Sequence, residues 1–305
     1  MRRIETTLLD AFLAAGYGEV STPSVEYEET LRRAGRGRVA SSFHVQGERG
    51  EELALRSDMT IPIARLAASR YGPDEMPLRF CSVAPAYRAV APNRGQAREH
   101  LQAGIELIGG DPTSSCAEAI SLLAGSLQKT GLKEVYIGIG DAALYPEMLQ
   151  RFDVGGADAT GILEALAARN FVEMDRLIGL LDIGSEAAGL LSRIPRMRGP
   201  KLLENCDEED LDPSMTRIRD VVDALEPGVA NRVIIDLGRC PRMSYYTGIV
   251  FEAYDASLGE PVASGGHYGE LLSRFGREGG GVGFAVVVDL VHAALAGESR
   301  GETGP

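Results

Sequence analysis

The sequence predicts an α+β fold in which an antiparallel sheet is flanked by helices and carries a helical insertion. Helical and strand-like segments are intermixed, without the strand–helix alternation that is typical of a parallel sheet. Two strand-like segments, 78–90 and 101–109, flank a polar loop and indicate a long antiparallel hairpin. Residues 142–226 instead contain Leu- and Ala-rich helical segments separated by glycines, which indicate the insertion.

The first part of the chain mixes short helices and strands. A first helix is predicted by apolar residues that recur at helical spacing before a Gly-Tyr-Gly stop, namely Ile4, Leu8, Leu9, Phe12 and Leu13. An extended segment follows around Val20. Residues 38–56 are typical of two strands around a polar turn, and 60–71 return to a helical pattern.

The rest of the chain completes the core around the insertion. A helix at about 112–127 and a strand ending at Asp141 follow the hairpin. Strand patterns return at 232–237, 246–254 and 281–288, a last helix follows, and the glycine-rich segment 264–269 is interpreted as a loop. We therefore expect a core domain made of residues 1–141 and 227–305, with 142–226 as a helical insertion.

Composition narrows the classes of function. The 305 residues include 31 Lys and Arg against 44 Asp and Glu, and the formal net charge of -13 disfavours nucleic acid as a partner. The four cysteines are far apart and no metal-ligand spacing occurs, so neither disulfides nor a metal site is expected. No signal-peptide, membrane-span or nucleotide-binding glycine motif is recognised, and we expect a cytoplasmic protein with no membrane partner and no cofactor.

The segment LQAGIELIG carries candidate binding residues. Because side chains alternate along a strand, Gln102, Gly104 and Glu106 share one face and the apolar residues share the other. The glycine leaves space for a ligand to lie against the sheet, although a polar face can also simply meet water. Arg88, on the paired strand, is a candidate clamp for a carboxylate or phosphate, but a solvated surface arginine is equally compatible with the pattern.

Four further residues are candidates for the same site. Asp58 precedes the helix that begins near Thr60, where a carboxylate is explained by helix capping as well as by ligand binding. Tyr245 and Tyr246 are expected to point to opposite faces of a strand, so that one of them lines a site. Tyr268 lies beside glycines that allow a close approach of a ligand.

Taken in order, these segments resemble the catalytic domain of histidyl-tRNA synthetase, a class II aminoacyl-tRNA synthetase. The matching segments span about residues 1–293: GYGEVSTPSVE, ALRSDMTIPIARLAA, AYRAVAPNRGQAREHLQAGIELIG, SYYTGIVFEAY, ASGGHYGELLSRFG and GVGFAVVVDLV. The resemblance implies a class II sheet, a dimer built around the first of these motifs, and a histidine-binding pocket.

The resemblance also assigns the pocket residues. It implies that Asp58, Gln102 and Glu106 receive the amino group and part of the side chain of histidine. It further implies that Tyr246 and Tyr268, with Glu106, surround the imidazole, and it places Arg88 at the arginine of the second class II motif. A zwitterionic amino acid with an imidazole side chain matches this set of carboxylates and phenols.

The sequence departs from the synthetase pattern at positions whose side chains bind ATP or take part in catalysis in that family. The adenine-reading glutamate is replaced by Val90, and a loop arginine by Gln96. The arginine of the third motif is replaced by Leu290, and the histidine-specific catalytic arginine by Pro241, with Arg242 one residue further on. Because positive charge stabilises the transferring phosphorus in adenylation, the sequence predicts no catalytic residues and no synthetase activity.

This combination resembles the regulatory subunit of ATP phosphoribosyltransferase. The resemblance implies a hetero-oligomer with the short catalytic subunit, support of the first step of histidine biosynthesis, and feedback control by histidine. Two alternatives stay open: an enzyme that adenylates histidine or a related amino acid for a tRNA or non-tRNA acceptor, and a dimeric scaffold without a ligand.

Overall fold

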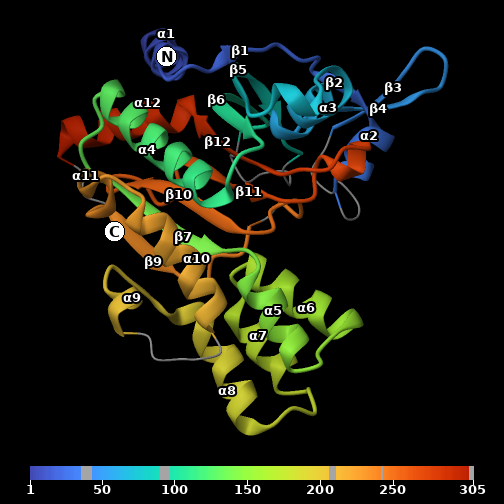
Figure 1. Cartoon of the computed structure of the whole chain (residues 1–305), viewed down its shortest axis with the longest axis vertical. Helices are drawn as coiled ribbons and strands as arrows, with labels where there is room; N and C mark the ends of the chain where they lie inside the picture. The colour runs from blue at the N-terminus through green and yellow to red at the C-terminus, as the bar shows by residue number, and fades with distance from the viewer. Residues whose placement is uncertain (36–42, 90–96, 206–210, 242, 302–305) are drawn as a thin grey trace.

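The computed structural model describes residues 1–35, 43–89, 97–205, 211–241 and 243–301 (Figure 1). A nine-stranded sheet forms its centre, with strand order β1-β5-β6-β12-β11-β10-β7-β9-β8. The strands are β1 (Gly18–Glu19), β5 (Leu78–Tyr87), β6 (Glu99–Ile108), β7 (Val135–Asp141), β8 (Arg198–Gly199), β9 (Val233–Asp236), β10 (Ile249–Asp255), β11 (Ala263–Tyr268) and β12 (Gly281–Val287).

Most of this sheet is antiparallel, as predicted, and the α+β class is confirmed. The two exceptions among the described strands are the parallel pairs β1–β5 and β7–β9, so the sheet is mixed. The predicted hairpin is the β5–β6 pair, whose register runs from Leu78 opposite Ile108 to Tyr87 opposite Glu99. The order of β6, β12, β11 and β10 brings together segments that are far apart in sequence.

Three helices cover one face of the sheet: α1 (Arg2–Ala14), α4 (Pro112–Thr130) and α12 (Val288–Arg300). The largest hydrophobic core lies beneath them, and the rings of Phe12 and Phe284 meet edge to face with centroids 5.6 Å apart. Asp111 begins α4 by accepting a hydrogen bond from the Ser114 amide at 2.9 Å, which satisfies a free N–H group of the first turn. Of the predicted first-helix residues, Leu13 is 44% exposed and does not belong to the core.

The opposite face is covered near β5 and β6 by a smaller layer. It contains α3 (Thr60–Arg70), α2 (Glu28–Ala34) and a three-stranded sheet of order β2-β4-β3, which lie together at the upper right of Figure 1. The strands are β2 (Val25–Tyr27), β3 (His44–Gln46) and β4 (Glu52–Leu55), and short 3-10 turns follow at Pro73–Glu75 and Ser273–Phe275. A second hydrophobic cluster, which includes Ile63, Phe80 and Tyr268, lies beneath this layer.

The segment between β7 and β9 is largely helical, and α5 to α8 project below the sheet in Figure 1. Its helices are α5 (Leu144–Arg151), α6 (Gly156–Ala167), α7 (Phe171–Ile178), α8 (Ser185–Arg193), a 3-10 turn (Ile194–Arg196), α9 (Leu202–Asn205), α10 (Asp212–Asp223) and α11 (Pro227–Ala230). The short strand β8 joins the edge of the main sheet, and α10 packs against α4. The division into a core domain and an insertion at 142–226 stays a prediction.

Two local predictions are wrong. Residues 264–269 were expected to form a loop, but β11 occupies Ala263–Tyr268 and pairs with β10 and β12 on its two sides. Tyr245 and Tyr246 do not lie in a strand, because β10 begins only at Ile249 and the tyrosines occupy the turn before it. Their rings are adjacent, with centroids 4.7 Å apart, and do not project from opposite faces of a sheet.

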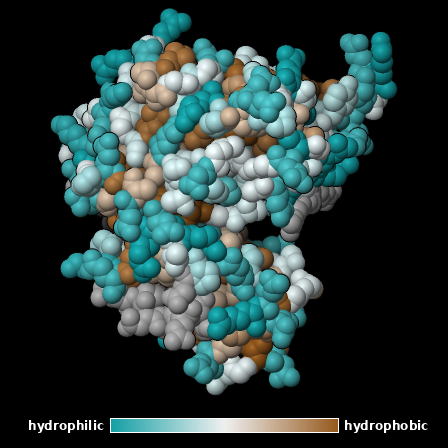
Figure 2. All heavy atoms as spheres, viewed as in Figure 1, coloured by the Kyte–Doolittle hydropathy of each residue, from teal (hydrophilic) through white to brown (hydrophobic). Residues whose placement is uncertain are grey.

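The surface seen in Figure 2 is mostly hydrophilic, with scattered apolar patches and a narrower region between the sheet and the projecting helices. Among the described helices, none combines the length and the apolar character that crossing a membrane requires.

Candidate functional site

The polar residues of β6 lie on the sheet face beneath α3. Gln102 and Glu106 are both buried there, with 3% and 4% of their surfaces exposed. Ala103, Ile105 and Leu107 point the other way, into the core beneath α1, α4 and α12. The shared face that the alternation predicted is therefore confirmed: Gln102 and Glu106 are buried on it, and Gly104 between them is partly exposed.

Glu106 is held by two hydroxyl groups from distant parts of the chain. Thr60 Oγ1 donates a hydrogen bond to its Oε1 at 2.6 Å, and Tyr268 Oη donates to its Oε2 at 2.6 Å. Burial raises the pKa of the Glu106 carboxyl to about 7, although both hydrogen bonds act in the opposite direction. The group therefore changes charge near neutral pH.

Asp58 is buried beside this carboxyl and also caps α3. Its Oδ1 accepts a hydrogen bond from the Ile61 amide at 3.1 Å, and its Oδ2 accepts one from Ser57 Oγ at 3.2 Å. Burial raises the pKa of Asp58, and the positive charge of Arg88 is among the influences that lower it. The capping interpretation from the sequence is thus correct, and it is compatible with a second role in the pocket.

Three tyrosines form the side wall of the pocket. The ring of Tyr245 packs edge to face on that of Tyr268 at 6.2 Å and is tilted against that of Tyr246 at 4.7 Å. Tyr268 is fully buried, whereas Tyr246 retains partial exposure. Burial, followed by the charges of Glu106 and Asp58, raises the pKa of Tyr246, so these three groups lie close together.

Glycines on β11 and β12 leave room for these side chains. A Cβ atom on Gly283 would lie 2.2 Å from Glu106 Oε2, and one on Gly281 would lie 2.7 Å from Tyr268 Oη. A Cβ on Gly266 would lie 2.8 Å from Tyr246 Cδ1. Any larger residue at these positions would displace the pocket wall.

A small cavity of about 10 Å³ separates α3 from the sheet, with room for roughly one water molecule. Its lining is Met59, Thr60, Ile63, Ser82, Gln102, Gly104, Ile105, Glu106, Phe284 and Ala285. Gln102 Oε1 is buried and has no hydrogen-bond partner among the described residues. An acceptor without a partner at such a site is suited to a donor supplied by a ligand.

Arg88 lies at the end of the β5–β6 hairpin, where its amide donates to the Arg98 carbonyl at 2.9 Å. Of the positions that depart from the synthetase pattern, Leu290 packs against the main core from α12 and Pro241 is partly buried. Val90, Gln96 and Arg242 lie outside the described residues. No group of three or more His, Cys, Asp or Glu side chains is placed to hold a metal in the part of the chain that the structure describes.

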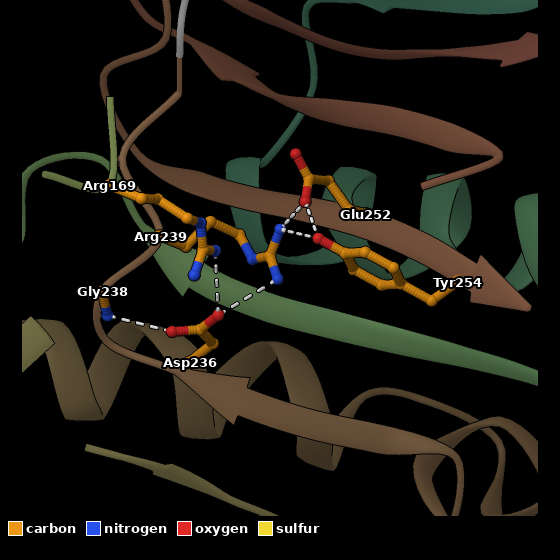
Figure 3. A network of polar contacts seen from close by, with 6 residues as sticks. All are labelled: Arg169, Asp236, Gly238, Arg239, Glu252 and Tyr254. Carbon is orange, nitrogen blue, oxygen red and sulfur yellow. Dashed lines mark hydrogen bonds and ion pairs between the residues drawn. The ribbon is translucent and has the colours of Figure 1, made fainter. Parts of the chain in front are cut away.

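A second polar cluster, which the sequence reasoning missed, lies on β9 and β10 (Figure 3). Arg239 is 7% exposed and contacts Glu252 through Nη1, while its Nη2 is 3.3 Å from Asp236 Oδ2. Tyr254 donates to the same Glu252 oxygen, and Arg169 of the helical segment reaches Asp236 at 3.4 Å. In the sequence, the sign of this cluster was Arg239 itself, six residues before Tyr245. The strands that carry its partners Asp236 and Glu252 could not be predicted to lie beside it.

Known proteins resemble this chain over nearly its whole length. The family model described as Histidyl-tRNA synthetase matches residues 1–291. An ATP phosphoribosyltransferase regulatory subunit of Bacillus velezensis is 35% identical over 96% of this chain and 77% of its own length.

Two solved structures extend the comparison. The crystal structure of an ATP phosphoribosyltransferase regulatory subunit/histidyl-tRNA synthetase from Bacillus halodurans superposes with a TM-score of 0.87 at 32% identity, over 96% of this chain and 78% of the other. A histidyl-tRNA synthetase from Nostoc shares the fold with a TM-score of 0.76 at 19% identity, over 99% of this chain and 73% of the other. The chain belongs to the histidyl-tRNA synthetase family and, within it, to the group of the ATP phosphoribosyltransferase regulatory subunits.

Proposed function

We propose that this chain is a regulatory subunit of ATP phosphoribosyltransferase and has no synthetase activity of its own. Relatives that match nearly the whole chain are named ATP phosphoribosyltransferase regulatory subunits, which supports this role. The loss of positive charge at Leu290 and Pro241 supports the absence of adenylation, because a phosphoryl-transfer transition state needs such charge.

The observation that carries the proposal is the retained pocket around Glu106. Gln102 Oε1 is buried without a partner, as expected of an acceptor for the ammonium group of an amino acid. Asp58 adds negative charge near this group, and Arg88 supplies a positive charge for the ligand's carboxylate. Glu106, Tyr246 and Tyr268 then surround the imidazole of histidine.

Both carboxylate oxygens of Glu106 already accept hydrogen bonds, from the hydroxyl groups of Thr60 and Tyr268. An imidazole that binds Glu106 must therefore compete with these hydroxyl groups. A ligand that rearranges its own pocket has different affinities for two states of the protein. That difference is what feedback control requires.

The proposed partner is the short catalytic subunit of ATP phosphoribosyltransferase, in a cytoplasmic hetero-oligomer that also contains a homodimer of this chain. In support of the homodimer, three apolar side chains near the first class II motif are exposed in the single chain. They are Val25 at 41%, Tyr27 at 60% and Val45 at 41%. Exposed apolar side chains that cluster on one sheet favour a protein interface.

The decisive experiment is co-purification with the short catalytic subunit, followed by an assay with ATP and phosphoribosyl pyrophosphate. We expect a complex, higher activity in the presence of this chain, and inhibition by histidine that requires it. If no complex forms and the rate does not change, the regulatory role is refuted.

The alternative function is adenylation of histidine or a related amino acid, for a tRNA or non-tRNA acceptor. Retention of the amino-acid pocket together with Arg88 favours it. Histidine-dependent exchange of pyrophosphate into ATP by the isolated chain would establish this activity, and we expect none.

Binding of histidine distinguishes both functions from a scaffold without a ligand. We expect calorimetry to detect histidine binding that is lost in Glu106→Ala and Tyr268→Ala. Because Tyr136 is exposed on β7 and lies outside the pocket, Tyr136→Ala is the matched control and should bind as the unmodified chain does.

A further inference from the structure

Arg56 is a buried cation whose hydrogen bonds go to backbone carbonyls. Only 3% of its surface is exposed. Its Nε donates to the Pro85 carbonyl at 2.9 Å, and its Nη1 donates to the carbonyls of Thr22 at 2.6 Å and Pro23 at 3.2 Å. Burial lowers the pKa of the guanidinium. The free-energy cost of burying this charge is offset by carbonyl dipoles.

These hydrogen bonds join three segments of the chain. The first two acceptors precede β2, Pro85 lies on β5, and Arg56 directly follows β4. Backbone hydrogen bonds strengthen the junction: the Arg56 amide donates to the Ser24 carbonyl at 3.0 Å, and the Tyr87 amide donates to the Arg56 carbonyl at 3.0 Å. The segment around Arg56 is therefore fixed to the end of β5 by both its side chain and its backbone.

Each of the two segments joined in this way carries a proposed pocket residue. Asp58 is two residues after Arg56, and Arg88 directly follows Tyr87. Burial raises the pKa of Asp58 and the charge of Arg88 acts against it, so these two side chains lie close together. In the proposed function, Asp58 adds negative charge near the ligand's ammonium group and Arg88 supplies positive charge for its carboxylate. The hydrogen bonds of Arg56 therefore fix the segments that carry both charges.

We propose that Arg56 is a positioning residue of the histidine pocket. It holds Asp58 and Arg88 at the separation that the ammonium and carboxylate groups of one amino acid require. It does so without touching the ligand, through the backbones of the two segments that it joins. The inference rests on the proposed histidine site.

The guanidinium group suits this role. Its nitrogens donate in fixed directions within one plane, so Nε reaches β5 while Nη1 reaches the segment before β2. A lysine ammonium is a single donor point on a flexible stem and cannot span the same acceptors. Because binding groups must be held within about 0.5 Å of their productive positions, we expect the loss of one anchor to lower affinity.

Ligands that carry only one of the two charged groups report on this separation. Histamine lacks the carboxylate and imidazolepropionate lacks the ammonium group, whereas both retain the imidazole. A ligand with one charged group can follow a displaced Asp58 or a displaced Arg88. Histidine must meet both residues at once, so its affinity depends on how well their spacing is preorganised.

The test is calorimetry of the full chain with histidine, histamine and imidazolepropionate, using competition with histidine for the weaker ligands. Arg56→Lys should weaken histidine binding by about tenfold and the other two by about threefold or less. Arg79→Lys is the matched control, because Arg79 also lies on β5 but pairs at 2.9 Å with Glu118 of α4. This control should leave all three affinities unchanged.

Two results with Arg56→Lys would overturn the positioning role. One is an equal loss of affinity for all three ligands, which a general loss of structure would produce. The other is histidine binding equal to that of the unmodified chain. If the unmodified chain itself binds no histidine, the proposed histidine site is refuted, and the positioning role is refuted with it.

Thr22→Val provides the test if Arg56→Lys does not fold. It keeps the guanidinium and the Thr22 carbonyl, and removes only the hydroxyl group that lies 3.4 Å from Nη1. It should weaken histidine binding by about threefold and leave histamine binding unchanged, as the loss of one weak hydrogen bond predicts. Unchanged binding of histidine by Thr22→Val would then overturn the role of Arg56.

Discussion

At the scale of single residues, Glu106 has the property with the clearest measurable consequence. Its pKa of about 7 in the folded chain lies above the ordinary value of 4.5, because burial disfavours the charged form. Between these two values the folded state keeps a proton that the unfolded chain releases. The contribution to stability is therefore fully present below pH 4.5 and is lost as pH rises to 7.

This linkage gives the first prediction. The unfolding free energy of the unmodified chain, relative to Glu106→Gln, should fall by on the order of 3 kcal/mol between pH 4.5 and pH 7. Urea unfolding of both proteins at several pH values measures it.

The control for this prediction is Glu118→Gln. The hydrogen bond from Arg79 lowers the pKa of Glu118, so its stabilising contribution is lost only as pH falls through that lowered value. Between pH 4.5 and pH 7, the unfolding free energy of Glu118→Gln should change with pH as it does in the unmodified chain. A difference between the unmodified chain and Glu106→Gln that does not vary with pH would contradict the burial argument.

Sequence reasoning reached some of the site residues by physical argument and others only by resemblance. The period-two alternation was enough to place Gln102 and Glu106 on one face. Tyr246 and Tyr268 gave no such signal, because what makes Tyr268 a pocket residue is a hydrogen bond to Glu106 across 162 positions of the chain. The contact between Arg239 and Glu252 was missed for the same reason, since it depends on which segments lie beside β10.

At the scale of elements, β11 accounts for the largest error in the prediction from sequence. Gly265 and Gly266 have low intrinsic strand propensity and suggested a loop. They form a strand because β10 and β12 pair with both of its edges and because neighbouring side chains fill the space above them. Tertiary context outweighed local propensity here.

The second prediction concerns the neighbouring strand β12. In Gly283→Ala the new methyl group would meet both the Glu106 carboxylate at 2.2 Å and the Ile105 carbonyl at 2.6 Å, and the backbone cannot move away without breaking the sheet. We expect a loss of about 1–3 kcal/mol in unfolding free energy, typical of overpacking.

Gly189→Ala is the matched control for that substitution. Gly189 lies inside α8, where a Cβ would have no neighbour within 4 Å. Alanine there should stabilise the chain by about 0.5–1 kcal/mol through helix propensity. Equal stability of Gly283→Ala and the unmodified chain would mean that β12 has more room than its contacts indicate.

At the scale of the whole molecule, the small β2-β4-β3 sheet supports the proposed homodimer. Tyr27 and Val45 are both opposite Leu53, so the three side chains share one face of this sheet. Burying that face against a second copy removes apolar surface from water.

The third prediction tests this face. Tyr27→Glu should shift sedimentation-velocity profiles toward the monomer at a given concentration, because a charge would be buried in the interface. Val172→Glu on α7 is the control, since Val172 is 83% exposed and lies outside this sheet. If both variants sediment alike, another face forms the dimer.

The separation of the pocket walls along the chain bears on synthesis of the protein. Glu106 meets its partner Tyr268 only after 162 further residues, and the strands that support both, β11 and β12, are translated after β6. A nascent chain therefore exposes β6, with its carboxylate and amide, well before anything can cover them. The proposed histidine pocket therefore cannot assemble on the nascent chain until translation has passed Val287.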